Sequence, residues 1–169
     1  RGQYLCCHPA FISEYTTMPQ QMPDSSNEHI AFIGGGNMAS AIIGGLLKRG
    51  LSASQIQVIE PFAEQRARLA KQFQVTVSET PGVSLNRAAV VVWAVKPQTF
   101  REAAAQSRAH TQNALHLSVA AGIRSDTIAG WLGTERVVRA MPNTPALIGR
   151  GIAGLYARPG VTDPERADV

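Results

Sequence analysis

The chain has 169 residues, enough to bury one core of ordinary size, and its 44% apolar and 17% charged residues are typical of a folded globular protein rather than a disordered tail. No segment approaches the roughly 20 consecutive apolar residues that a membrane-spanning helix needs, so we expect no membrane partner. The net charge is +4, but the basic residues are scattered rather than clustered with aromatic residues. This distribution argues against a nucleic-acid partner and fits an anionic small molecule better.

Residues 1–28 lack hydrophobic periodicity and contain several prolines, so we interpret them as a disordered leader. The leader has no continuous apolar stretch of the kind found in secretory signals, and a cytoplasmic location is therefore expected. Cys6 and Cys7 are the only cysteines, and because they are adjacent they form neither a disulfide framework nor a metal-ligand spacing. Met18 and Met22 precede the first apolar strand, which suggests that the leader is upstream or added sequence.

From residue 29 onward, apolar runs with strand character alternate with helical segments. Strands are predicted, in chain order, at 30–33, 56–59, 75–77, 89–95, 115–119 and 136–140, and helices between them at 38–48, 63–73, 99–107 and 125–132. The run from Val90 to Trp93 is apolar at every position, as expected of a parallel strand covered by helices on both faces. The pattern predicts an α/β fold with a doubly wound, Rossmann-type parallel sheet, in a single domain at 29–158.

A glycine-rich turn follows the first predicted strand and reads G-x-G-x-x-A. Gly34 would allow the tight turn out of the strand, Gly36 would let the backbone approach a pyrophosphate, and Ala39 would permit close packing of the helix on the strand. The phosphates would then lie at the amino terminus of the helix, where unpaired N–H groups and the helix dipole favour an anion. Because the motif joins a strand to a helix, it predicts a dinucleotide site rather than an ordinary turn.

Glu60 ends the second predicted strand, 24 residues after Gly36 and near the usual spacing of about 20. A carboxylate here can accept hydrogen bonds from both ribose hydroxyls and repel a 2′-phosphate, which favours NADH. Alternatively, Arg66 or Arg68 could meet a 2′-phosphate, so both NADPH and NADH remain candidate cofactors.

Three later turns lie at the predicted carboxyl ends of strands, where ligands gather in such sheets. Lys96 could neutralise phosphate or polarise a substrate group, or could simply be solvated. The small residues at 118–123 would allow a flat nicotinamide ring to approach, or form only a tight turn. Asn143 and Thr144 lie between two prolines in a rigid polar loop that could orient cofactor or substrate, or be only a turn. The histidines form no ligand cluster, and no metal site is expected.

Four segments resemble pyrroline-5-carboxylate reductase in order and spacing: 30–47, 93–98, 118–123 and 137–157. The resemblance implies reduction of the cyclic imine 1-pyrroline-5-carboxylate to L-proline by hydride transfer from NADPH or NADH, the last step of proline biosynthesis. The substrate would be a small-molecule imine, with Asn143 near the reacting centre. The chain differs from the family at Thr80 and Pro81, where an Asn near the adenosine is common.

The resemblance and the pattern of turns together predict a set of cofactor-binding residues, with Lys96 and Asn143 as the candidate catalytic residues. The set is Ile33, Gly34, Gly35, Gly36, Asn37, Met38, Glu60, Ala94, Val95, Lys96, Pro97, Ala120, Ala121 and Gly122.

The family also has a helical domain through which it forms homo-oligomers, and residues 159–169 would begin the linker to it. We therefore expect this chain to bind dinucleotide with negligible turnover. One alternative is a related oxidoreductase that pairs NADP with a deazaflavin, against which the loop at 141–145 argues. Another is a stand-alone dinucleotide-binding module.

Overall fold

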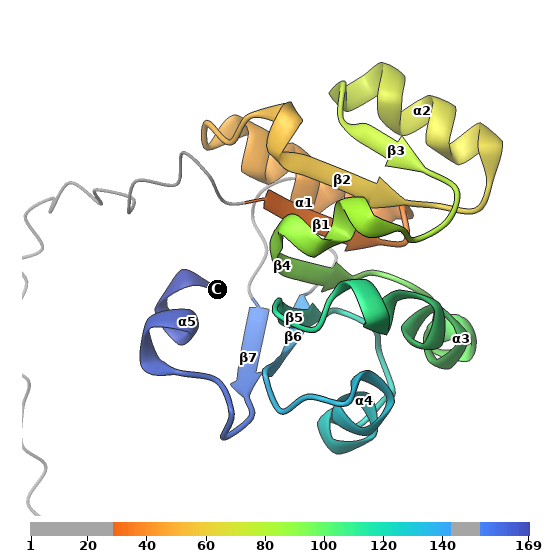
Figure 1. Ribbon diagram of the computed structural model, residues 1–169. Helices are drawn as coiled ribbons and strands as arrows, with labels where there is room; N and C mark the ends of the chain where they lie inside the picture. Colours follow the sequence, from red (N-terminus) through yellow and green to blue (C-terminus); the bar gives the residue numbers. More distant parts are fainter. Residues whose placement is uncertain (1–28, 143–152) are drawn as a thin grey trace, which may run out of the picture.

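The computed structural model describes residues 29–142 and 153–169 of the chain. In these ranges a single seven-stranded sheet has the order β3-β2-β1-β4-β5-β6-β7 (Figure 1). The strands are β1 (His29–Ile33), β2 (Ile56–Ile59), β3 (Thr76–Ser78), β4 (Ala88–Trp93), β5 (Leu115–Ser118), β6 (Val137–Pro142) and β7 (Ala153–Ala157). All neighbouring strands are parallel except β7, which pairs antiparallel with β6.

Helices or a short 3-10 turn connect successive parallel strands, as the strand order requires, and one further helix follows β7. The helices are α1 (Asn37–Lys48), α2 (Ala63–Phe73), α3 (Pro97–Ser107), α4 (Ser125–Leu132) and α5 (Asp163–Asp168), with short 3-10 turns at Ala53–Gln55, Val83–Arg87 and Arg108–His110. Pro97 occupies the first turn of α3, where its missing N–H is harmless. Gly133 ends α4 in the left-handed conformation that helix termini commonly adopt.

The sheet is covered on both faces, and successive residues of the central strand β4 alternate between two cores. Val91 and Trp93 pack with Phe100 of α3 in one hydrophobic cluster, which also contains residues of α4. Val92 packs with Ile43 of α1 in the other cluster, to which α2 contributes as well. Burying one such side chain stabilises the fold by about 1.5–3 kcal/mol, so β4 is anchored from both sides.

The doubly wound parallel sheet predicted from the sequence is confirmed, and each predicted strand and helix is present with its ends shifted by at most two residues. The prediction for β4 was too long: the strand ends at Trp93 rather than at Val95. The chain leaves the sheet there because it turns into α3, and Lys96 is extended, as is usual for a residue before proline.

β7 and α5 were not predicted from the sequence: β7 adds an antiparallel edge to the sheet, and α5 follows it (Figure 1). β7 is short and exposed along most of its length, so it carries no clear alternation of apolar and polar residues. Residues 159–169, predicted to begin a linker, contain α5 and the buried Val161, which is only 3% exposed. Within the described ranges, every helix is too short or too polar to cross a bilayer.

Candidate functional site

The carboxyl ends of β1, β2 and β4 meet where the order of the strands reverses. β1 lies between β2 and β4, so the chain winds outward in both directions from the β1–β4 pair. In open α/β sheets, ligands bind in the crevice at this point. The turns after these three strands therefore define the candidate site.

The glycine-rich turn after β1 is wedged between the ends of β2 and β4. The N–H of Gly34 donates to the Ile59 carbonyl at 2.8 Å, and Gly34 has φ +94°. A Cβ at this position would lie 2.7 Å from the carbonyl oxygen of Ala94. Only glycine fits this backbone and this space, which accounts for the tight turn predicted from the sequence.

The other end of the turn is open. Gly36 is exposed and forms the N-cap of α1, and a Cβ built on it would meet no atom within 4 Å. No side chain caps this helix end and its first turn holds no acidic residue. The first N–H groups of a helix and the positive end of its dipole attract anions, so this position fits a phosphate or pyrophosphate. Ala39, which is fully buried, lets α1 pack closely on the sheet beneath it.

Glu60 lies directly after β2, beside the glycine-rich turn, and is only 6% exposed. One carboxylate oxygen accepts the N–H of Gly35 at 2.8 Å and the other accepts the N–H of Phe62 at 3.0 Å. Both oxygens thus already bind backbone donors, which the pattern analysis did not anticipate. Its role in recognising ribose remains a prediction.

Arg66, a predicted alternative partner for a 2′-phosphate, is engaged within the same crossover. Its guanidinium donates to the carbonyls of Glu60 at 2.8 Å and Pro61 at 2.7 Å, and pairs with Glu79 at 3.1 Å. Arg68 is exposed on α2. A 2′-phosphate would therefore have to compete for Arg66 with three existing acceptors.

The turn after β4 backs directly onto the glycine-rich turn. Ala94 donates its N–H to the Ile33 carbonyl at 2.9 Å, and Val95 Cγ1 would lie 3.0 Å from a Cβ on Gly34. Lys96 is the exposed N-cap of α3, and its carbonyl accepts the N–H of Thr99 at 3.1 Å. The fold thus brings the predicted residues Ala94 and Val95 beside Ile33 and Gly34.

The turn after β5 contains the predicted residues Ala120, Ala121 and Gly122, of which only Ala120 is buried. Arg139 of β6 donates to the Ala120 carbonyl and to Ser118 Oγ, the latter at 3.3 Å, and so fixes this turn. Partial burial lowers the pKa of Arg139, but an arginine remains charged. Arg139 was not predicted as a site residue, although a basic residue inside an apolar strand was the available signal.

The candidate catalytic residue Asn143, with the neighbouring Thr144, lies outside the described residues. Its predicted position near the reacting centre remains a prediction. Among residues 29–142 and 153–169 there is no group of three or more His, Cys, Asp or Glu side chains arranged to hold a metal ion.

A buried aromatic cluster supports the end of β4 below this site. Trp93 stacks on Phe100 with ring centroids 4.9 Å apart, and its Nε1–H donates to His116 Nδ1 at 3.0 Å. Burial lowers the pKa of His116 to about 4, although a hydrogen bond with the Thr111 backbone acts in the opposite direction. His116 is therefore neutral at physiological pH and belongs to the core.

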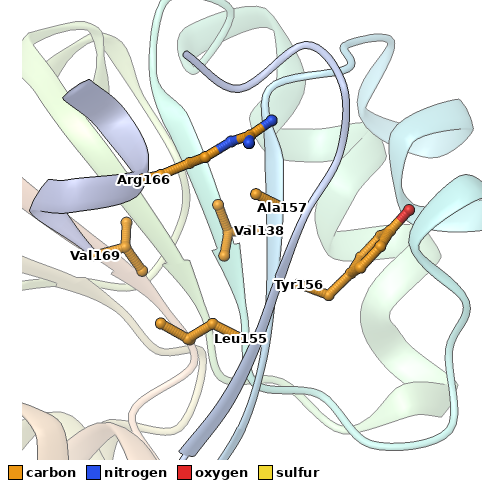
Figure 2. A pocket seen from close by; sticks show the side chains of 6 residues that line it. All are labelled: Val138, Leu155, Tyr156, Ala157, Arg166 and Val169. Carbon is orange, nitrogen blue, oxygen red and sulfur yellow. The ribbon is translucent and has the colours of Figure 1, made fainter. Parts of the chain in front are cut away.

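A groove of about 300 Å³ lies at the β7 edge of the sheet, between β6, β7 and α5. Figure 2 shows Leu155, Val138 and Val169 around it, with Arg166 at one end. None of the predicted cofactor-binding residues lines this groove. It is separate from the candidate site.

Comparison with known proteins agrees with this architecture. Residues 29–122 match the family described as NADP oxidoreductase coenzyme F420-dependent. The chain is 46% identical to pyrroline-5-carboxylate reductase of Pseudomonas aeruginosa, over 81% of this chain and 51% of that protein. It is 48% identical to the reductase of Haemophilus influenzae, over 76% of this chain and 48% of the relative.

A solved pyrroline-5-carboxylate reductase from Coxiella burnetii superposes with a TM-score of 0.78 at 31% identity, covering 83% of this chain and 53% of the other. The resemblance inferred from the sequence motifs is confirmed. The chain spans about half the length of the relatives that it matches.

Proposed function

Because this chain belongs to the family of coenzyme F420-dependent NADP oxidoreductases, we propose that it binds NADPH or NADH at the carboxyl ends of β1 and β4. The observation that carries the proposal is the open amino terminus of α1, where Gly36 faces empty space and no side chain caps the helix. Gly34 and the turn after β4 would form the floor of the site, at the carboxyl ends of the strands. The small residues 120–122 would offer a flat surface for the nicotinamide.

We further propose that the chain contributes this site to the reduction of 1-pyrroline-5-carboxylate to L-proline. The identities of 46% and 48% to two reductases support this substrate over a deazaflavin partner. The family match covers only residues 29–122, a dinucleotide-binding region that both kinds of oxidoreductase can share, so it does not separate them.

When bound, the reduced nicotinamide would supply the hydride, and the protein's task is to orient it. A protonated imine is already electrophilic at carbon, so the reaction needs no strong protein acid. Lys96, exposed at the start of α3, is available to neutralise phosphate or polarise a substrate group. Asn143 is proposed to lie near the imine. The cytoplasmic location and the homo-oligomer predicted from the sequence remain predictions.

Cofactor binding is tested by fluorescence titration of the chain with NADH and, separately, NADPH. Saturable binding is expected for at least one of them. A matched pair of variants, Gly36→Asp and Gly45→Asp, distinguishes the phosphate site from a general effect of added charge on α1. Gly45 also faces open space but lies farther along the helix, so only Gly36→Asp should abolish binding.

The substrate is tested with a chimera that joins this chain to the remaining, unmatched half of the Pseudomonas reductase. We expect oxidation of NADPH or NADH that depends on 1-pyrroline-5-carboxylate, and its loss in Gly36→Asp. The intact relative serves as the positive control. A folded chimera that binds cofactor without turnover would contradict the proposed substrate and favour a stand-alone binding module.

A further inference from the structure

Gly35, in the middle of the glycine-rich turn, is held through both of its backbone polar groups by the crossover between β2 and α2. Its N–H donates to Glu60 Oε2 at 2.8 Å. Its carbonyl accepts a hydrogen bond from Gln65 Nε2 of α2. The contacts span 25 and 30 residues of sequence, so they depend on the tertiary fold.

The crossover also fills the space beside Gly35. A Cβ on this residue would lie 2.5 Å from Leu69 Cδ1 and 3.2 Å from Glu60 Oε2. A Cβ built on the next residue, Gly36, would have no neighbouring atom within 4 Å. One side of the turn is thus packed against protein, and the other faces the open end of α1.

Glu60 is itself fixed from two directions. Its second carboxylate oxygen accepts the N–H of Phe62 at 3.0 Å, and its backbone carbonyl accepts Arg66 Nη1 at 2.8 Å. A buried carboxylate with both oxygens bound to backbone donors cannot rotate without leaving those donors unpaired. It therefore makes a rigid support for the turn.

The bond from Gln65 has a geometric consequence for the next residue. The carbonyl of Gly35 and the N–H of Gly36 belong to one peptide group, and none of the described peptide bonds is cis. In a trans peptide these two groups point in opposite directions. With the carbonyl held toward α2, the N–H of Gly36 is directed away from α2, toward the open side of the turn.

We propose that Glu60 and Gln65 are positioning residues: Glu60 holds the Gly34–Gly35 peptide and Gln65 holds the Gly35–Gly36 peptide, so that the Gly36 N–H is preset for the cofactor's phosphate. This inference rests on the proposed dinucleotide binding. NADH and NADPH share the pyrophosphate, so removing the hydrogen bonds from Glu60 or Gln65 should lower the affinity for both cofactors alike. If Glu60 chiefly recognised ribose, its substitution would instead change the ratio of NADH affinity to NADPH affinity.

Glu60→Gln, Gln65→Ala and the control Glu64→Gln test the proposal. Glutamine at 60 keeps one acceptor oxygen but turns an amide NH₂ toward a backbone N–H. Alanine at 65 removes the donor to the Gly35 carbonyl. Glu64 is an exposed acid in the first turn of α2, so its substitution makes the same charge change as Glu60→Gln outside the contacts to the turn.

Three measurements are made on each folded variant: dissociation constants for NADH and NADPH, thermal unfolding, and amide hydrogen exchange of Gly35 and Gly36 without cofactor. We expect Glu60→Gln to lower the affinity for both cofactors about tenfold, and Gln65→Ala to lower it about threefold or more, since single hydrogen bonds have effects of this order. Exchange at Gly35 should accelerate in Glu60→Gln. The control should match wild type in both affinities and in exchange, and Gln65→Ala should stay folded, with an unfolding temperature lowered by only about a few degrees.

A fall in NADH affinity with a gain in NADPH affinity would overturn the proposal in favour of ribose recognition. Unchanged affinities for both cofactors in a folded Gln65→Ala would overturn the part played by Gln65, and in a folded Glu60→Gln that of Glu60. If Glu60→Gln fails to fold, the Gln65 variant decides. If the wild-type protein bound neither cofactor, the proposed function would be refuted. This inference would then fall with it, even if hydrogen exchange at Gly35 changed as expected.

Discussion

Two glycine-to-alanine substitutions in the same turn should affect different properties: Gly34→Ala should lower stability, and Gly36→Ala should lower cofactor affinity. Gly34 has φ +94°, a conformation that costs a residue with a Cβ about 1–3 kcal/mol. The added Cβ would also lie 2.7 Å from the Ala94 carbonyl oxygen, which cannot move without disturbing the β1–β4 pairing. Overpacking of this kind costs about 1–3 kcal/mol. Together these predict that Gly34→Ala lowers the free energy of unfolding by about 4 kcal/mol.

Gly36→Ala should change the free energy of unfolding by less than about 1 kcal/mol. Its φ of −70° suits any residue, and the new Cβ would meet no protein atom. The methyl group would instead occupy the space proposed for the phosphates. We expect the affinity for both NADH and NADPH to fall by about tenfold or more, as for overpacking of a tight contact.

Urea unfolding followed by circular dichroism gives the stabilities, and fluorescence titration gives the dissociation constants. The pair of variants separates folding from binding because the substituted residues lie two positions apart in one turn. Two results would contradict these separate roles of Gly34 and Gly36: a Gly36→Ala variant as unstable as Gly34→Ala, or one that binds both cofactors as tightly as wild type.

Three further predictions concern the core and the sheet edge. Trp93→Phe leaves His116 Nδ1 without its donor and should cost about 2 kcal/mol in urea unfolding; a neutral result would contradict the contribution of the bond. The pKa of His116 is about 4, below the value of 6.5 expected when unfolded, so the unfolded state binds more protons between these pH values. Stability should therefore fall by about 3 kcal/mol as the pH drops from 6.5 to 4, and His116→Gln should flatten that slope. Thr162 Oγ1 accepts the N–H of Glu165 and so caps α5. Thr162→Ala should lower the free energy of unfolding by about 1 kcal/mol and speed amide exchange in α5 alone. Unchanged exchange in α5 would contradict the capping role of Thr162.

Local pattern was sufficient for the parallel part of the sheet and the helices that cover it. Alternating apolar and helical runs predicted the six parallel strands and the helices between them, because each repeats a period that burial on a sheet or a helix face imposes. The antiparallel β7 escaped, since a short exposed edge strand is specified by its pairing partner β6 more than by its own residues.

Residue pattern and spacing were enough to predict the doubly wound sheet, the position of the glycine-rich turn and an acid at the end of β2. What these residues contact depends on how the chain folds. Sequence spacing made Glu60 a candidate to bind ribose, but only the folded chain shows its carboxylate bound to the N–H of Gly35, 25 residues away. The fold likewise pairs Arg66 with Glu79, 13 residues away, and Arg139 with the Ala120 carbonyl, 19 residues away. Hydrogen-bond partners distant in sequence are set by how strands and helices pack, and that packing has no signature in a local pattern.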